Sequence, residues 1–297
     1  RVLFVWLFSG WMPSFRFSVK SFKQLFSFGS KLLLSSLLHT IYTNLYTMII
    51  GLKFSAGELG FYNRAFTLAQ FPSTNLTNVI VLAIYPIQCR LQDDHEQLYG
   101  MFLKYMRMAC FFIFPVMIGL CALAEPLVRL LLTDKWLPAV PLLQILCIAY
   151  MWDPVMKINH NMLNVKGRSD YFLYAEILKK AVAFLILFLT IPFGIKVMCA
   201  GLIIYSFADI VIITYYTRKL IGISLYIQFK ELYPVILLSF SMGAVMYGSV
   251  LIFQNVWLQF GIGMLSGSLY FLVLSRYFRF QEFIILKEIL SRKPKDK

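Results

Sequence analysis

The chain has 297 residues, of which 60% are apolar, 17% aromatic and only 14% charged, and its mean hydropathy is +0.73. This composition excludes a disordered chain and argues against a water-soluble enzyme. The apolar residues form long unbroken runs, which predicts transmembrane helices. A net charge of +14 would suggest nucleic acid in a soluble protein, but here we expect no nucleic-acid partner, because basic loops commonly anchor membrane helices.

The expected elements are transmembrane helices of about 20 residues each. The apolar segment 1–9 is too short to span, so we expect it to end a helix that begins upstream of Arg1, and the sequence to be a fragment. Prolines fall inside several spans, Pro154 among them, where neighbouring helices are expected to satisfy the carbonyls that proline frees. The eight expected spans are roughly 25–51, 66–89, 107–124, 138–158, 171–192, 196–216, 233–253 and 256–275.

Lysine and arginine are divided unevenly between alternate loops. Most lie in the loops near 16–23, 90–107, 157–168 and 218–230 and in the tail 276–297. By the positive-inside rule these loops are cytoplasmic, and an even number of spans places the C-terminus there too. The tail is expected to lie as a basic amphipathic helix on an anionic leaflet, or to fray. The opposite loops carry only Lys53, Arg64, Arg129, Lys135 and Lys196.

Motifs of catalysis are absent from the sequence. It contains no G-x-x-x-x-G-K-[ST], G-x-S-x-G or H-E-x-x-H, and neither its five cysteines nor its three histidines have metal-ligand spacing. The expected outer loops are short and hold few acids, whereas a membrane glycosyltransferase or polymerase usually needs acids there. We therefore expect no enzyme, no catalytic residue, no metal and no cofactor.

A polar stripe runs along the first span. Lys31, Ser35, His39, Tyr42 and Tyr46 follow helical spacing, and the opposite face is Leu, Ile and Met. Such a stripe lines a wet cavity or forms hydrogen bonds between helices of a dry bundle, and we favour the cavity. Lys31 lies near the cytoplasmic end of the span and could instead extend to the membrane surface.

A second polar face begins at Arg64 and continues through Thr67, Thr74 and Asn78. The Arg64 guanidinium has five donors and suits bidentate contact with a phosphate. The alternative is that Arg64 anchors the helix at the membrane surface or pairs with Glu58.

Ionisable groups cost about 2.5–3.5 kcal/mol each at the centre of a bilayer, so each one inside a span is a candidate for function. Two acid–lysine pairs stand one helical turn apart, Asp153 with Lys157 and Glu176 with Lys180. Such pairs can neutralise themselves, so Asp153 is a candidate either for charge pairing or for ion coupling.

The pair of Glu176 with Lys180 leaves Lys179 unpaired by sequence, and Asp209 is the deepest unpaired acid. Asp209 could pair with Lys179, Lys31 or Arg64, or carry a coupling cation or proton. Because cations match or exceed acids over the spans and their rims, the cavity is expected to prefer an anion. The expected substrate-binding residues are Arg64, Lys31, Lys179, His39, Tyr46 and Asn78.

Short motifs occur in a fixed order, namely Phe28-Gly29, Ile49-Ile50-Gly51, ELGFYNRA at 58–65, YPIQCRLQDD at 85–94, KWLPAVP at 135–141 and Gly167-Arg168. Together they resemble Wzx-type polysaccharide flippases of the multidrug/oligosaccharidyl-lipid/polysaccharide (MOP) exporter superfamily, over about residues 10–220. The resemblance is closest to the lipopolysaccharide-biosynthesis branch with colanic-acid and teichuronic-acid exporters. Many relatives have Asp where this chain has Tyr46, so the resemblance carries no ion-coupling acid over to this helix.

The resemblance implies an all-α, polytopic transmembrane bundle that corresponds to helices 7–14 of a two-lobe transporter. Residues 1–24 would then be the end of a preceding helix and a cytoplasmic linker, and residues 25–216 the C-terminal six-helix lobe. Residues 217–275 would be a linker and two additional helices, and residues 276–297 the basic cytoplasmic tail. The N-terminal lobe of the same protein would be a missing partner.

The implied function is transport of an oligosaccharide linked to a polyprenyl diphosphate of the undecaprenyl type across the cytoplasmic (inner) membrane of a bacterium. It would serve lipopolysaccharide, capsule or exopolysaccharide biosynthesis by alternating access, with cavity cations on the diphosphate and membrane lipids around the lipid tail. Two alternatives stay open. A multidrug or cation antiporter of the same superfamily should have more acids than cations in its cavity, and a membrane-embedded polymerase or glycosyltransferase should have catalytic residues on an outer loop.

Overall fold

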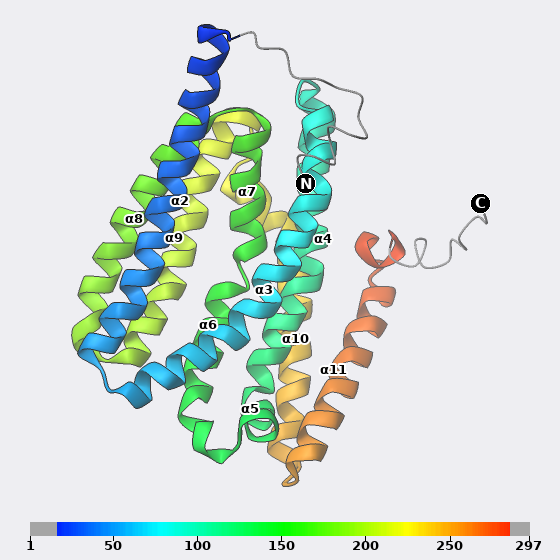
Figure 1. The fold of residues 1–297 in the computed structure, drawn as a ribbon. Helices are drawn as coiled ribbons and strands as arrows, with labels where there is room; N and C mark the ends of the chain where they lie inside the picture. The colour runs from blue at the N-terminus through cyan, green and yellow to red at the C-terminus, as the bar shows by residue number, and fades with distance from the viewer. Residues whose placement is uncertain (1–16, 286–297) are drawn as a thin grey trace, which may run out of the picture.

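The computed structural model describes residues 17–285, and this part of the chain is built of helices and contains no strand (Figure 1). The expected all-α fold is confirmed. The α-helices are α2 (Val19–Lys53), α3 (Ala56–Arg90), α4 (His95–Ala122), α5 (Ala124–Leu132), α6 (Val140–Tyr150), α7 (Asp153–Val165), α8 (Ser169–Thr190), α9 (Ile195–Ile221), α10 (Leu225–Ile252) and α11 (Val256–Tyr277). Two 3-10 turns, η1 (Asp134–Ala139) and η2 (Ile191–Phe193), follow α5 and α8.

Five helical segments within residues 17–285 are long and apolar enough to cross a membrane. They are α4, the segment Asp134–Val165 that contains α6 and α7, α9, α10 and α11. The remaining three expected spans coincide with α2, α3 and α8, which have 35, 35 and 22 residues. These helices are long enough to cross a membrane, but they are not among the five segments that are also apolar enough. A multi-pass membrane protein is supported, whereas the expected total of eight spans is not confirmed.

The helices form a bundle with two arms, which Figure 1 shows from the side. On one side α2 packs along α8, and α8 along α9. The broken segment of α6 and α7 lies in the middle, between α9 and α3. On the other side α10 packs between α4 and α11. Helices α2 and α3 are consecutive but diverge from their common turn, so they touch little. The α2 residues Ser36, Thr40 and Thr43 are exposed.

The loops expected to be cytoplasmic lie toward one end of the bundle. The beginning of α2, the α3–α4 turn, the α7–α8 turn and the α9–α10 turn all lie toward the upper end in Figure 1, while the α2–α3 and α10–α11 turns lie at the lower end. The uneven distribution of lysine and arginine is therefore a difference between two ends of one bundle. That the basic end faces the cytoplasm stays a prediction.

The segment of α6 and α7 is interrupted at Met151 and Trp152 because of a proline. Pro154 has no N–H, so the carbonyl of Tyr150, four residues earlier, loses its helical donor. The hydroxyl of Ser73 in α3 donates to that carbonyl oxygen at 2.7 Å, and the hydroxyl of Ser206 in α9 donates to the carbonyl of Ala149 at 3.1 Å. Neighbouring helices thus satisfy the freed carbonyls, as the sequence predicted.

The last two helices are tied to the rest of the bundle at its basic end. Arg107 of α4 contacts Glu231 of α10 at 2.9 Å and Glu282, just beyond α11, at 2.7 Å. The Glu282 side chain is almost fully buried, so this arginine neutralises an acid that would be costly alone. Most of the tail 276–297, expected to be an amphipathic helix, lies outside the described residues.

Helix α3 begins with a reciprocal cap. The Ser55 hydroxyl accepts from the Glu58 N–H at 3.2 Å, and the Glu58 carboxylate accepts from the Ser55 N–H at 3.0 Å and from its hydroxyl at 2.9 Å. These bonds from Ser55 hold the pKa of Glu58 below its usual range. The cap is therefore complete above the unfolded-state pKa of about 4.3, and its contribution is lost as the pH falls through the lower folded-state pKa.

Ser55→Ala is expected to lower the free energy of unfolding by about 1 kcal/mol at neutral pH, because the Glu58 N–H loses its acceptor and the Glu58 carboxylate loses a hydroxyl donor. The difference from the unsubstituted protein should shrink in acid, when Glu58 is protonated. Thermal unfolding in detergent from neutral to acidic pH measures both effects. Ser27→Ala, an exposed mid-helix site in α2, is the matched control. A difference that grows in acid would contradict the capping role of Glu58.

Candidate functional site

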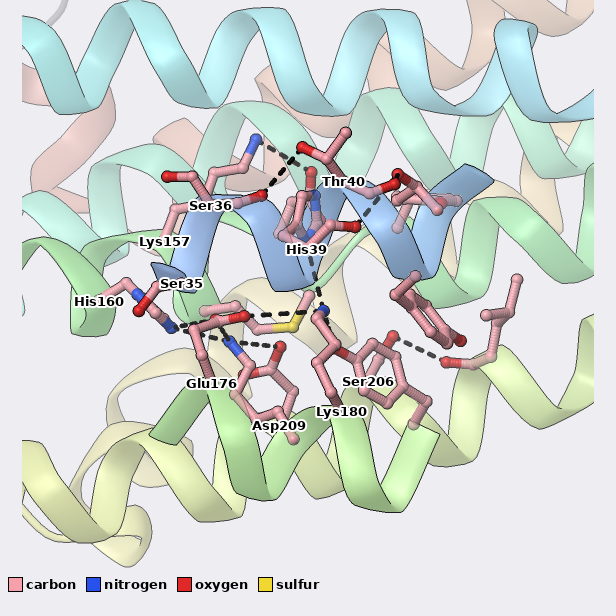
Figure 2. A pocket seen from close by; sticks show the side chains of 18 of the residues that line it. Ser35, Ser36, His39, Thr40, Lys157, His160, Glu176, Lys180, Ser206 and Asp209 are labelled. Carbon is pink, nitrogen blue, oxygen red and sulfur yellow. Dashed lines mark hydrogen bonds and ion pairs between the residues drawn. The ribbon is translucent and has the colours of Figure 1, made fainter. Parts of the chain in front are cut away.

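A cavity of about 430 Å³ opens between α2, the α6–α7 interruption, α8 and α9. Its volume lies within the range of small-molecule sites, about 300–1,000 Å³. The middle of the polar stripe on α2 faces it, as expected, while the cavity floor carries charged side chains of α7, α8 and α9 (Figure 2). The α2 residues that line it are Ser35, Ser36, His39, Thr40, Tyr42 and Thr43.

Four side chains on the floor form one buried ion cluster. The Lys179 ammonium lies 2.7 Å from a Glu176 oxygen, 3.2 Å from an Asp209 oxygen and 2.7 Å from His160 Nε2. His160 Nε2 also lies 3.0 Å from the same Glu176 oxygen, so the imidazole either accepts from Lys179 or donates to Glu176, depending on its tautomer. Glu176, Lys179 and Asp209 are each at most 6% exposed, so the cluster is deep in the bundle. Figure 2 shows Glu176, Asp209 and His160 converging from α8, α9 and α7.

Lys180 is held more loosely than Lys179. Its ammonium lies 3.2 Å from the Tyr205 hydroxyl, 3.3 Å from His39 Nδ1 and 3.7 Å from the second oxygen of Glu176. It also lies over the ring of Tyr42, at 4.9 Å from the centroid. Aromatic faces attract a cation without using its hydrogens. Lys180 therefore combines long contacts with a position on the cavity wall, where a ligand could replace one of them.

A second pair lies beside the helix interruption. Lys157 is 3.3 Å from Asp153, one turn away on α7, and it also donates to Asn78 of α3 at 3.2 Å. The Thr74 hydroxyl of α3 donates to Asp153 at 2.9 Å. This pair links α3 to α7, and Asp153 and Lys157 both line the cavity.

The charges of this cavity balance. Its lining contains three acids, Asp153, Glu176 and Asp209, and each of them lies within 4 Å of a lysine. Three lysines line it too, so the walls carry no net charge while both histidines are neutral. The excess of cations expected for the spans and rims as a whole is not present at this cavity.

The structure brings together four of the expected site residues, namely His39, Lys179, Asp153 and Asp209, on one cavity. Asp209 pairs with Lys179, one of the three partners considered for it. The other expected residues, Arg64, Lys31, Tyr46 and Asn78, are not part of the lining. Whether any of the eight binds substrate or couples an ion stays a prediction.

Two of the outlying residues have other partners. Arg64 is exposed on α3, and its guanidinium lies over the Trp136 ring at 5.4 Å from the centroid, not beside Glu58. Tyr46 is buried, and its hydroxyl donates to the Met198 carbonyl at 3.1 Å. Tyr46 thereby fastens α2 to α9, which is a packing contact between helices.

Sequence reasoning missed His160, Tyr205 and the central place of Lys180. The wide separation of the histidines in the sequence gives no reason to group them, although His39 and His160 line the same cavity. A usable signal existed, since Lys157, His160 and Asn161 continue one side of α7 from Asp153 at helical spacing.

A separate apolar cavity of about 540 Å³ lies between α3, α4, α10 and α11. Met242, Met246 and Met264 line it together with Phe71 and Phe260. Methionine side chains are flexible and adapt to irregular apolar shapes. This cavity can accommodate hydrocarbon, and its lining contains no charged side chain.

Comparison with known proteins shows that the chain is similar to proteins of polysaccharide biosynthesis. Residues 1–141 match the family described as polysaccharide biosynthesis protein. The resemblance expected from the motifs is confirmed. The teichuronic acid biosynthesis protein TuaB of Bacillus subtilis (strain 168) is 26% identical over 269 residues, which are 89% of this chain and 56% of TuaB.

Two further similarities agree with this result. The lipopolysaccharide biosynthesis protein WzxC of Escherichia coli (strain K12) is 30% identical over 158 residues, 53% of this chain and 32% of WzxC. The solved structure of the lipid II flippase MurJ in an inward closed conformation has a TM-score of 0.71 at 14% identity, over 90% of this chain and 57% of MurJ. At 14% identity, the similarity to MurJ shows that the two chains share a fold and does not extend to function. The chain spans about half the length of TuaB and of MurJ.

Proposed function

We propose that this chain transports a lipid-linked oligosaccharide across a bacterial cytoplasmic membrane. The observation that carries the proposal is a cavity with buried charges, hydroxyls and aromatic rings inside a bundle with the MurJ fold. Buried ionisable groups between membrane helices are costly and mark substrate or ion pathways. The names of the related proteins, which refer to teichuronic acid and lipopolysaccharide biosynthesis, support a glycan as cargo.

The polar cavity and the apolar cavity have complementary roles in this proposal. The oligosaccharide of the substrate occupies the polar cavity among α2, α7, α8 and α9, and its lipid chain lies along the apolar cavity beside α10 and α11. Replacing water by fixed polar groups lowers the barrier for a headgroup to cross the membrane, and no bond is made or broken. This division follows from the charge content of the two linings.

A second lobe is part of the proposed transport unit. TuaB extends well beyond the 56% of its length that this chain matches, and the divergence of α2 from α3 leaves Ser36, Thr40 and Thr43 of α2 exposed. A second helical lobe facing α2 would close the cavity on that side and permit alternating access. An undecaprenyl-type diphosphate carrier and a cytoplasmic C-terminus belong to the same proposal.

The balance of charges argues against a cation antiporter. Such a protein should have more acids than cations around its cavity, but the lining holds as many lysines as acids. A membrane-embedded polymerase has no specific observation in its favour among the described residues.

Transport is tested in cells that carry the gene. Deleting it should remove the surface glycan and make lipid-linked glycan accumulate in the inner leaflet, and the unsubstituted gene should restore export. Lys180→Met should reduce export about tenfold or more, the effect of losing one charge-assisted hydrogen bond to the cargo. Lys196→Met, an exposed lysine at the beginning of α9, is the matched control. Unchanged surface glycan after deletion would reject the function, provided that no second exporter is present.

A further inference from the structure

The donors of the charged cavity are largely used up by its own acceptors. The Lys179 ammonium lies 2.7 Å from Glu176, 3.2 Å from Asp209 and 2.7 Å from His160. The hydroxyls of Thr40 and Thr43 donate to backbone carbonyls of their own helix at 2.9 and 3.2 Å. The oxygens of these hydroxyls keep free lone pairs, so they face a ligand mainly as hydrogen-bond acceptors.

Two carboxylate oxygens on the floor accept no hydrogen bond, although the Lys180 ammonium lies 3.7 Å from one of them. They are the second oxygen of Glu176 and one oxygen of Asp209, and both atoms are buried. The two residues are 6% and 5% exposed, and both belong to the cavity lining. A buried acceptor without a donor is unfavourable, so these oxygens favour a partner that brings hydrogens.

A diphosphate does not fit that requirement. Its oxygens are acceptors and carry negative charge, so they would face the free Glu176 and Asp209 oxygens with repulsion and without a hydrogen to share. The balanced lining offers no net positive field to offset that repulsion. A sugar hydroxyl both donates and accepts, and it carries no charge. It can donate to Glu176 or Asp209 and accept from Lys180.

The aromatic rings of the cavity agree with a sugar ligand. Tyr42 and Tyr205 lie next to each other on the wall, with ring centroids 6.1 Å apart, and Lys180 lies over both. A pyranose ring carries both C–H and O–H groups. Its C–H groups can pack against an aromatic ring while its hydroxyls form hydrogen bonds with charged side chains nearby.

A metal cation is disfavoured by the same geometry. The position between the Glu176 and Asp209 carboxylates, where a cation would bind, is taken by the Lys179 ammonium at 2.7 and 3.2 Å. A second positive charge there would be repelled by Lys179 and by Lys180 nearby.

We propose that this cavity binds uncharged sugar hydroxyls of the glycan through Glu176, Asp209 and Lys180, and that the diphosphate of the substrate is held outside it. The proposal rests on the proposed function and names which part of the substrate enters this site.

The test uses a cysteine reporter on the cavity wall. Thr40→Cys places a thiol on α2 away from the ion cluster, and Thr67→Cys on α3, exposed and outside the lining, is the matched control. The full chain is prepared in detergent, and the rate of modification by a small neutral thiol reagent is measured and corrected for the unsubstituted protein. The probes are inorganic pyrophosphate and the glycan released by mild acid from the lipid-linked saccharides of the producing cells.

The glycan is expected to slow modification of Thr40→Cys at least severalfold, with no effect at Thr67→Cys, and pyrophosphate is expected to leave both rates unchanged. Adding Asp209→Asn should weaken protection by the glycan, since an amide offers a donor where the carboxylate oxygen accepted. Protection by pyrophosphate, or no protection by the glycan, overturns the proposal. Failure of the proposed function is seen separately, as export that continues after gene deletion.

Discussion

Lys179→Met is expected to destabilise the folded protein by about 3–5 kcal/mol, which is the usual effect of leaving a buried acid without its counter-charge. Lys179 is 4% exposed and is the only lysine in the described part of the chain within 4 Å of Asp209. Methionine has a similar length and fills the space, so the loss measures charge rather than volume. Thermal or denaturant unfolding of the full chain in detergent gives the difference.

A second substitution distinguishes charge compensation from packing. Lys179→Met combined with Asp209→Asn should regain more than half of the lost stability, because Glu176 still has Lys180 within 3.7 Å. Lys196→Met, at an exposed lysine, should change stability little. If the double variant is no more stable than the single one, the cluster does not act through charge pairing.

Gly243→Ala is expected to destabilise the contact of α10 with α4 by about 1–3 kcal/mol, the usual effect of overpacking a core. A Cβ on Gly243 would lie 2.4 Å from Cγ2 of Ile118, a buried, β-branched side chain that has little freedom to move. The same unfolding measurement applies. Gly243 permits a close approach of two helices, as small residues commonly do in membranes.

Gly248→Ala is the control for this prediction, since it changes the same residue type in the same helix. A Cβ there would meet nothing within 4 Å, so the gain in helix propensity should stabilise the protein by about 0.5–1 kcal/mol. Ile118→Ala should lessen the effect of Gly243→Ala by removing the group that clashes. Equal effects of the two glycine substitutions would contradict a steric cause.

Local features of the fold were predicted from the sequence. The apolar runs located the long helices. A membrane helix forms its backbone hydrogen bonds within its own segment, so the length and apolarity of that segment are enough to predict it. Charge pairs on one helix were also predicted, such as Asp153 with Lys157 at 3.3 Å, because helical spacing alone brings them together. The expected number of eight spans is not confirmed. Helices α2, α3 and α8 do not meet the length and hydropathy measure that the five other segments meet.

The pairs between helices were not predicted with the same certainty. Lys180 meets His39, 141 residues earlier, and Lys179 meets Asp209 on another helix. Such contacts depend on how each helix is rotated about its axis. A helix with polar residues on two or more sides does not reveal that rotation from its sequence. The same freedom explains why Arg64 stacks on Trp136 rather than lining the cavity.

The sequence by itself determined that the chain is a bundle of membrane helices, where the long helices lie, and that the carbonyls freed by Pro154 need donors from neighbouring helices. These properties depend on apolarity and on backbone hydrogen bonds within each segment. Only the tertiary structure decided which charges meet and that they balance, because close packing, as between Gly243 and Ile118, sets the rotation of each helix. The chemistry of the cavity therefore follows from that packing rather than from the number of charged residues.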